Sequence, residues 1–166
     1  MTVETVRARP NGGIPNHPSL PALVVRGAVA GMDADAARRA AEARGWGGTW
    51  VWSVFDYHHY HPDAHEALAV VAGRARLRLG GPEGTEVSVA AGDVAVLPAG
   101  FGHCLLSSAD GFRVVGAYPA GQESPATLRA GARDIDAALA AIAGVALPDR
   151  GPFEGVTLSD WGVGAG

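Results

Sequence analysis

The sequence predicts an all-β domain, an antiparallel sandwich or barrel, with helical additions at its N- and C-terminal ends. Residues 66–118 form a run of short apolar segments separated by Gly, Pro and Asp, which is typical of such sheets. Within this run Arg74, Arg76 and Arg78 alternate with Ala or Leu, so one face of the strand is wetted and the other is buried. Apolar residues at helical spacing occur before the run and after it.

The N-terminal part of the chain is expected to begin with an irregular segment. Residues 1–20 contain several Pro and Gly residues and no periodicity, which predicts an arm laid over the domain. A short strand is expected over residues 21–25. A helix follows over 32–45, with Asp33 or Asp35 as its cap and Gly at its end. The stretch 48–59, rich in Trp, Val, Phe and Tyr, then indicates a β run.

The rest of the chain is expected to alternate strands with turns and to finish on a helix. Strands are expected over 67–73, 74–80, 86–93, 94–100, 103–108 and 111–118, with a hairpin turn over 80–85. A helix is expected within 133–145, with Asp134 near its start, before a loop-like end. The predicted organisation is an N-terminal arm (1–20), a β-barrel with an N-terminal helix (21–120) and a C-terminal helix and extension (121–166).

Composition narrows the class of protein. A chain of 166 residues is long enough for one domain with a sizeable core. Its formal net charge is -4, and no stripe of basic residues is evident, so nucleic acid is not an expected partner. No segment is long and apolar enough for a membrane span. The single cysteine and the absence of an apolar signal-like core favour a cytoplasmic protein.

Four of the six histidines lie within eight positions, at His58, His59, His61 and His65. Because alternate strand residues face the same side, His59 and His61 can face the interior together, with His58 facing away. His103 follows a Pro/Gly turn that would return the chain to this strand. With a nearby carboxylate, three imidazoles would make a site for a divalent transition metal: Fe, Mn, Ni or Zn.

The spacing His59-x-His61-x4-Glu66-x6-Gly73 resembles the first motif of the cupins, H-x-H-x(3,4)-E-x(6)-G. Ser53 stands where that motif usually begins with Gly. This position does not ligate metal in the family, so the departure leaves the predicted site intact.

The spacing Gly92-x5-Pro98-x-Gly100-x2-His103 resembles the second cupin motif, with Ser107 in place of the final Asn. The two motifs, together with residues 45–66, 114–122 and 146–155, resemble the YjlB-like single-domain cupins. This resemblance implies a double-stranded β-helix, a jelly-roll barrel, with a metal pocket at one end. It implies the ligands His59, His61, Glu66 and His103, and it implies no particular substrate.

The fourth ligand has two candidates, because cupins allow three or four residues before the acidic position. His65 satisfies the shorter spacing and Glu66 the longer one. Gly73 fits the motif only when it is counted from Glu66. Strand alternation agrees. If Glu66 faces inward, Leu68 and Val70 face inward as well, and they fill a barrel interior better than the smaller Ala67 and Ala69 would. Glu66 is therefore favoured, and His65 is expected on the opposite face or at the mouth.

Other side chains receive weaker functional interpretations. Phe55 and Tyr57 share the alternation of His59, which places them at the pocket or in the core. Arg113 and Tyr118 lie on the last strand of the β run, and Arg113 is a candidate for holding a substrate carboxylate, although solvated arginine is commoner on such strands. Cys104 is expected to be a small buried hydrophobe.

Trp50 and Trp52 are expected to share the outward face of their strand. Two exposed indoles on one face form a patch that needs a cover. The N-terminal arm or a second subunit would provide it, and small cupins commonly pair, so a homodimer is expected.

The predicted function is that of a metal-dependent enzyme acting on a small anionic, oxygenated ligand, with a dioxygenase as the leading class. Three neutral imidazoles and one carboxylate leave a divalent ion with open positions and positive charge, which attract a chelating anion. An isomerase or other Lewis-acid reaction is also open, with Glu66 moving protons. The alternatives are a non-catalytic ligand-binding protein and a metal site that only stabilises the barrel.

Overall fold

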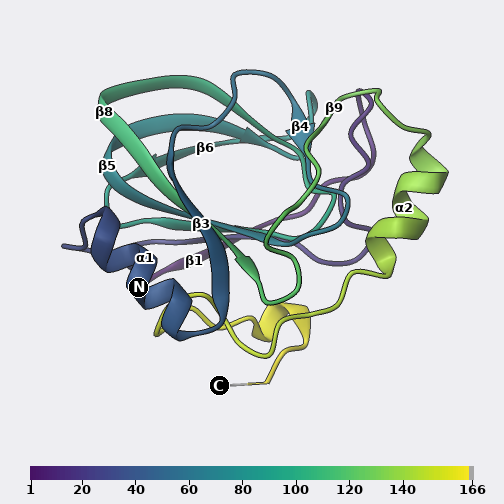
Figure 1. Ribbon diagram of the computed structural model, residues 1–166. Helices are drawn as coiled ribbons and strands as arrows, with labels where there is room; N and C mark the ends of the chain where they lie inside the picture. Colours follow the sequence, from purple (N-terminus) through teal and green to yellow (C-terminus); the bar gives the residue numbers. More distant parts are fainter. Residues whose placement is uncertain (165–166) are drawn as a thin grey trace.

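A single curled sheet of nine strands forms the body of the computed structural model, which describes residues 1–164 (Figure 1). Its main path runs in the order β1 (Val3–Val6), β2 (Ala22–Val25), β7 (Val94–Leu97), β5 (Glu66–Leu79), β8 (His103–Pro119), β4 (His59–Tyr60) and β9 (Leu128–Arg129). Off this path, β3 (Trp46–Trp52) pairs with β8, and β6 (Thr85–Ala90) pairs with β5. Every strand pairing is antiparallel, and the all-β prediction is confirmed.

The curled sheet has one core inside it and another on its outer face, and β5 contributes to both. Leu68 and Val70 pack inside with apolar side chains of β6, β7 and β8. Ala67 and Ala69 belong to the outer core, together with residues of helix α1 (Ala34–Ala43) and of the C-terminal segment. The small outward residues leave room for these covering elements. The alternation also puts Glu66 on the inner side of the sheet, next to Leu68.

Strands β5 and β8 are each continuous where the sequence predicts two shorter strands. Their pairing shifts register near Gly73, so the long ladder bends without ending. The backbone of Gly73 has a φ of 70°, and a Cβ there would lie 2.5 Å from the Phe112 nitrogen and 2.6 Å from the Ala109 oxygen. A side chain would therefore force the two strands apart. The glycine that follows Glu66 in the sequence motif marks a bend in the ladder and does not end a strand.

Both predicted helices are present, and each begins at the expected aspartate. The side chain of Asp33 accepts from the Ala36 N–H at 2.8 Å and caps α1. The side chain of Asp134 accepts from the Ala137 N–H at 3.0 Å and caps α2 (Ile135–Ala143). Within residues 1–164, neither of these helices, nor any other, has the length and hydropathy to cross a bilayer.

The first twenty residues lie along the barrel and hold one of its turns. Strand β1 adds to the sheet beside β2. The side chain of Asn16 is fully buried; its amide donates to the Gly80 carbonyl at 3.0 Å and its oxygen accepts from the Gly102 N–H at 3.0 Å. Asn16 thereby connects the turn after β5 with the turn that leads into His103. The N-terminal segment thus helps to fix the start of β8.

The C-terminal segment covers the outer face of the sheet. Phe153, Val156, Leu158 and Trp161 are buried there, and Trp161 lies in the short 3-10 helix η1 (Ser159–Trp161). The indole N–H of Trp161 donates to the carbonyl of Pro21 at 2.8 Å, which ties the end of the chain to the start of β2. Figure 1 shows this segment below the sheet, on the side where α1 also lies.

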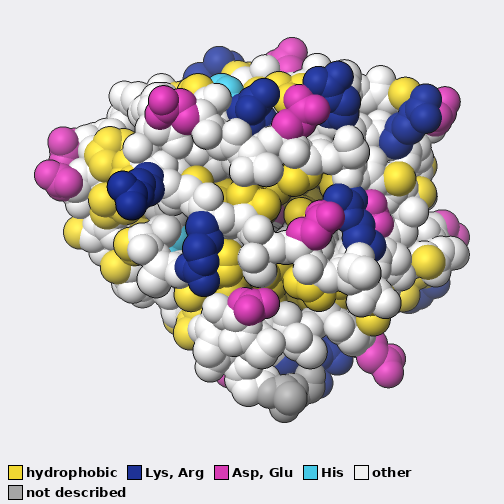
Figure 2. Space-filling model, turned by 180° about the vertical axis from the view of Figure 1, so that it is seen from behind, with side chains coloured by type: hydrophobic (Ala, Val, Ile, Leu, Met, Phe, Trp, Pro, Cys, Tyr) yellow, Lys and Arg dark blue, Asp and Glu magenta, His cyan; other side chains and the backbone are white. Residues whose placement is uncertain are grey.

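The surface opposite to the view of Figure 1 carries both signs of charge. Figure 2 shows Arg side chains standing beside Asp and Glu side chains across this face, around a hollow with an apolar floor. Ion pairs join some charged side chains of the protein: Arg26 contacts Glu4 at 2.8 Å and Asp93 at 3.0 Å, and Arg76 contacts Glu86 at 2.9 Å. Surface pairs of this kind contribute little to stability.

Candidate metal centre

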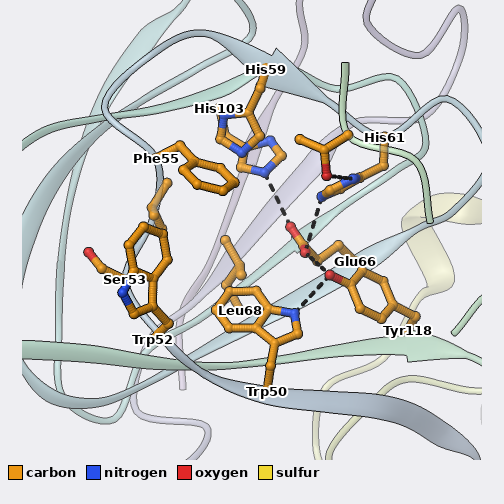
Figure 3. Close-up of a pocket in the computed structure, with 12 residues that line it drawn as sticks. Trp50, Trp52, Ser53, Phe55, His59, His61, Glu66, Leu68, His103 and Tyr118 are labelled. Atoms are coloured by element: carbon orange, nitrogen blue, oxygen red, sulfur yellow. Dashed lines mark hydrogen bonds and ion pairs between the residues drawn. The ribbon is translucent and has the colours of Figure 1, made fainter. Parts of the chain in front are cut away.

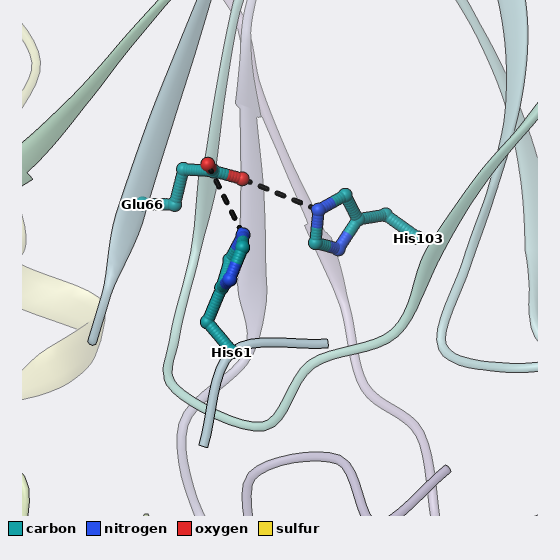
Figure 4. A group of neighbouring side chains, drawn as sticks. All are labelled: His61, Glu66 and His103. Carbon is teal, nitrogen blue, oxygen red and sulfur yellow. Dashed lines mark ion pairs between the residues drawn. The ribbon is translucent and has the colours of Figure 1, made fainter. Parts of the chain in front are cut away.

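Glu66 lies between two imidazoles inside the barrel. Its Oε2 is 3.2 Å from Nε2 of His61, and its Oε1 is 3.2 Å from Nε2 of His103 (Figure 4). All three side chains are buried, and Glu66 is only 2% exposed. One ligand atom from each residue lies within 4.8 Å of the others, which is close enough for a single metal ion to contact all three.

Strand pairing explains how residues distant in sequence meet here. Glu66 is the first residue of β5, and His103 is the first residue of β8, which lies between β5 and β4 in the sheet. The backbone of His103 pairs with His59 on β4. His61 comes just after β4, and its carbonyl accepts from the Gly100 N–H at 2.7 Å. The turn before β8 is thus bonded to the segment that carries the other histidines.

Backbone carbonyls orient all three histidine rings in the same way. Nδ1 of His59 lies 2.9 Å from the Tyr57 carbonyl, Nδ1 of His61 2.9 Å from the Ala126 carbonyl, and Nδ1 of His103 3.1 Å from the Phe101 carbonyl. Since a carbonyl can only accept, each Nδ1 carries a hydrogen. Nε2 is then the ring nitrogen free for other chemistry, and this anchoring is the usual support for a metal-binding imidazole.

His59 is the one predicted ligand outside the group of three. Its ring packs against the ring of His103 with centroids 3.9 Å apart, and it lines the same pocket. Burial, followed by the neighbouring His103, lowers the pKa of His59 to about 3, so the ring is neutral at ordinary pH. The structure therefore places His61, Glu66 and His103 together and His59 directly beside them.

The two sides of the ion pair hold each other in their charged forms. Burial alone would lower the pKa of His61, but the charge and hydrogen bond of Glu66 outweigh it and raise the value to about 9. Burial would likewise favour neutral Glu66, but His61 and His103 outweigh it and hold the carboxyl pKa well below its usual range. Glu66 is therefore an anion inside the barrel, which is the form that binds a metal.

A chain of two hydrogen bonds supports the carboxylate from the other side. The Tyr118 hydroxyl donates to Oε2 of Glu66 at 2.7 Å, and the Trp50 indole donates to the Tyr118 hydroxyl at 2.8 Å. Burial, then the charge of Glu66, raises the pKa of Tyr118, so the phenol keeps its proton. The indole of Trp50 lies over Gly116 on β8, where a Cβ would collide with the ring. Gly116 thus allows Trp50 to reach Tyr118.

The prediction that Trp50 and Trp52 face outward is wrong, because both line the pocket. The pairing of β3 with β8 shifts register between Gly47 and Trp50, and β3 ends at Trp52. Residues 53–58 are not in a strand, so the direction in which His59 points does not determine the direction in which Trp50 and Trp52 point. Sequence reasoning missed the contact of Trp50 with Tyr118 for this reason. A glycine at position 116, opposite a tryptophan, is the only sequence signal of it.

The pocket has a volume of about 350 Å³ and opens beside the cluster. Figure 3 shows the imidazoles and Glu66 on one side of it and the indoles of Trp50 and Trp52 on the other. Phe55, expected at the pocket or in the core, lines the pocket. Tyr57 stacks behind Phe55 with ring centroids 4.9 Å apart, and it does not line the pocket.

His65 faces the other way. Its ring is fully buried against Trp161, with centroids 5.0 Å apart, and its Nδ1 accepts from the Ala99 N–H at 2.9 Å. Burial, and the nearby His17, lower the pKa of His65 to about 4, so this ring is a neutral acceptor. The geometry places Glu66 at the cluster and His65 on the outer face, in the arrangement that the motif spacing favours.

Two further candidates lie away from the pocket. Arg113 is exposed on β8 and does not line the cavity, so the interpretation as a carboxylate-holding residue is not supported. Cys104 is buried beside His103, as expected, and burial raises the pKa of its thiol.

The residues present fit a divalent transition metal. Imidazole nitrogen and carboxylate oxygen are the donors that Fe, Mn, Ni and Zn accept in proteins. The Nε2 atoms of His61 and His103 point at the same carboxylate, and the Nε2 of His59 is left free by the same anchoring. A metal bound here would displace the Nε2 proton of His61. The set predicted from the sequence is thus compatible with the geometry.

Comparisons with solved structures return chains of low identity. An uncharacterized conserved protein with a double-stranded β-helix domain from Klebsiella pneumoniae is 19% identical, with a TM-score of 0.40, covering 74% of this chain and 84% of that one. The DMSP lyase DddQ from Ruegeria pomeroyi is 18% identical, also with a TM-score of 0.40, covering 70% of this chain and 45% of that one.

Sequence comparison is more informative. The uncharacterized protein YjlB of Bacillus subtilis is 43% identical over 111 residues, which span 67% of this chain and 66% of YjlB. The family model described as Cupin matches residues 57–141, just over half of the chain, and this region includes every predicted ligand. On these two findings, the chain belongs to the cupin family.

Proposed function

We propose that the protein binds one divalent transition metal through His59, His61, Glu66 and His103, and that it is a metal-dependent enzyme acting on a small anionic ligand. The observation that carries the proposal is the shared orientation of the imidazoles. Each Nδ1 is held by a backbone carbonyl, so each Nε2 is left for a ligand beside a buried carboxylate. Such support of the ring is expected where a metal is bound.

The chemistry divides between the metal and the protein. When bound, the ion would supply positive charge to hold a chelating anion and either activate dioxygen or polarise a carbonyl group. Glu66 would accept and return a proton at the reacting centre. The Tyr118 hydroxyl stabilises the anionic form of Glu66 by donating to Oε2. Leu68 and Val54 line the pocket and would limit the access of water. A dioxygenase is the leading class within this proposal.

The adjoining cavity favours an enzyme or a ligand-binding protein over a site that only stabilises the barrel. A purely structural metal needs no open space beside it, whereas about 350 Å³ of pocket adjoins the cluster here. Trp50 and Trp52 line the pocket, so they no longer argue for a subunit interface. The proposed homodimer is therefore based only on the common pairing of small cupins. The proposed cytoplasmic location is based on the single free cysteine, Cys104.

The test is metal analysis of protein purified without a histidine tag or a nickel column, followed by oxygen uptake with added Fe(II) and a panel of chelating anions. One equivalent of metal with substrate-dependent uptake supports the dioxygenase. Full metal content with ligand-dependent stabilisation and no turnover indicates a binding protein. Loss of stability on chelation, with no effect of any anion, leaves only a structural metal. Absence of metal under all loading conditions would reject the proposal.

A further inference from the structure

The pocket has two chemically different sides. The buried groups His61, Glu66 and His103 gather at one side, where a metal would hold an anionic head (Figure 3). The opposite side is built from aromatic and aliphatic residues, chiefly Trp50 and Trp52. A ligand that fills the space must therefore combine a polar, metal-binding end with an apolar body.

The charge of the lining limits the head to one anionic group. Among the residues that the structure describes, no arginine lines this cavity, and its charged or titratable lining groups all belong to the metal cluster or support it. The guanidinium of Arg129 lies over the ring of Tyr57, with its central carbon 3.7 Å from the ring centroid, and Arg129 does not line this cavity. A second carboxylate or a phosphate on the ligand would enter the pocket without a partner, which is costly.

The apolar side presents aromatic faces that the chain itself leaves open. Trp52 is 54% exposed and Phe55 is 37% exposed, although their rings contact each other with centroids 5.1 Å apart. The hydrogen bond to Tyr118 fixes the ring of Trp50, so the far wall is rigid. The volume of about 350 Å³ exceeds the roughly 150 Å³ cavity that holds benzene, and leaves room for a ring with a short head.

We propose that this pocket takes a chelating monoanion with an aromatic body, and that Trp52 and Phe55 select it. The head would lie at His61, Glu66 and His103, and the ring would pack against the exposed faces of Trp52 and Phe55. Aromatic rings prefer offset or edge-to-face contacts, which a tilted pair of this kind offers to a third ring. The inference rests on the proposed function, because the metal is what holds the head.

The test uses cobalt-loaded protein and four 2-hydroxy acids that share one chelating head: lactate, malate, hexahydromandelate and mandelate. The visible spectrum of cobalt reports binding of the head, and tryptophan fluorescence reports contact with the body. Mandelate should bind about 10-fold or more tightly than lactate, since a buried ring adds apolar area and ring contacts. Mandelate should also exceed hexahydromandelate, whose ring is saturated, and malate should bind no better than lactate.

Substitutions in the apolar wall distinguish its contribution to affinity from that of the metal-binding head of the ligand. Trp52→Leu and Phe55→Leu should bring the ratio of mandelate to lactate affinity, measured in the same variant, down toward one. Leu147→Ala, which alters an exposed apolar side chain outside this pocket, should change neither affinity. If all four acids perturb cobalt with equal affinity, or if malate binds best, the aromatic class is wrong and the proposed function stands. If cobalt itself does not bind, the proposed function fails, and this inference fails with it.

Discussion

The hydroxyl of Tyr118 donates to Oε2 of Glu66 at 2.7 Å, and this bond continues the register in which Ala117 on β8 pairs with Ala67 on β5. The two side chains face each other across paired strands, so the sheet itself fixes their separation. The carboxylate cannot rotate away from its two imidazoles without losing this donor.

Removing that donor should weaken metal binding. We expect Tyr118→Phe to lower metal affinity by about 10-fold, within the range found when a group that supports a ligand is lost. Competition with a chelator of known affinity measures the change. Tyr60→Phe is the matched control, because the Tyr60 hydroxyl is buried with no hydrogen-bond partner among the described residues. An equal effect of both substitutions would mean that Tyr118 contributes only packing.

Glu66 and His65 should differ sharply as metal ligands. Glu66→Gln removes the anion between the imidazoles, and we expect metal affinity to fall by more than about 100-fold, beyond the effect of a supporting residue. His65→Asn keeps an acceptor near the Ala99 N–H and should leave metal affinity within about 3-fold, because His65 faces the outer core. Isothermal titration with Zn or Mn compares the two proteins. A larger loss of metal affinity in His65→Asn than in Glu66→Gln would identify His65 as the ligand.

Metal should stabilise the folded protein by mass action. At a free metal concentration of 100 times the dissociation constant, the free energy of unfolding should rise by about 2.7 kcal/mol. Urea denaturation with and without metal measures this gain, and excess chelator should reverse it. His103→Ala removes the ligand supplied by β8 and should abolish the gain. Retention of the full gain in that variant would contradict the assignment.

Acid should weaken the fold through buried neutral histidines: His59 at the pocket, and His65 and His17, which also hold backbone groups. Nδ1 of His65 accepts from the Ala99 N–H, and Nδ1 of His17 accepts from the Leu20 N–H, so protonation would break both bonds. Burial lowers both pKa values to about 4, against 6.5 for the free side chain. Between these values the unfolded chain binds protons that the folded chain rejects, so the free energy of unfolding should fall as the pH drops from about 6.5 to about 4.

Urea denaturation of chelator-treated protein at a series of pH values measures this slope. The His65→Asn protein should show a shallower slope across the same window, because one of the histidines that stay neutral in the folded chain is gone. A slope unchanged by this substitution would assign the pH dependence elsewhere.

Gly116 should resist substitution more than a neighbouring glycine on the same pair of strands. A Cβ at Gly116 overlaps the rigid indole of Trp50, so Gly116→Ala should cost about 1–3 kcal/mol of unfolding free energy and displace Trp50 from Tyr118. Gly47→Ala is the control, since a Cβ at that position meets only Glu123 Cγ at an ordinary 3.7 Å. Urea denaturation measures the cost, and tryptophan fluorescence follows the displacement. Equal costs would show that the ring can shift freely.

The sequence predicts the strands and helices well where one local rule decides them. Asp33 and Asp134 cap their helices as a short acidic side chain before an apolar repeat should. Alternation along β5 correctly separates Leu68 and Val70 from Ala67 and Ala69. Within one unbroken strand, the two-residue period carries the orientation of a side chain reliably.

The errors come where the period is interrupted. The bulge after Gly47 and the irregular segment 53–58 reset the alternation, and Trp50 faces the pocket instead of the exterior. The hydrogen bonds of Nδ1 to the carbonyls of Tyr57, Ala126 and Phe101 depend on backbone positions that no residue type announces. Composition and spacing indicate which residues can bind a metal, whereas backbone geometry decides which ring nitrogen is available.

The hydrogen bond from the Trp161 indole to the Pro21 carbonyl joins residues that are 140 positions apart in the chain, so the ribosome makes one long after the other. The outer face, with Ala67 and Ala69, is covered from one end of the chain by α1 and from the other by the segment around Phe153. During translation this face of the sheet therefore stays partly exposed until the C-terminal segment has been synthesised. We expect the nascent chain to bind holding chaperones during this interval, since an exposed apolar surface favours aggregation before folding is complete.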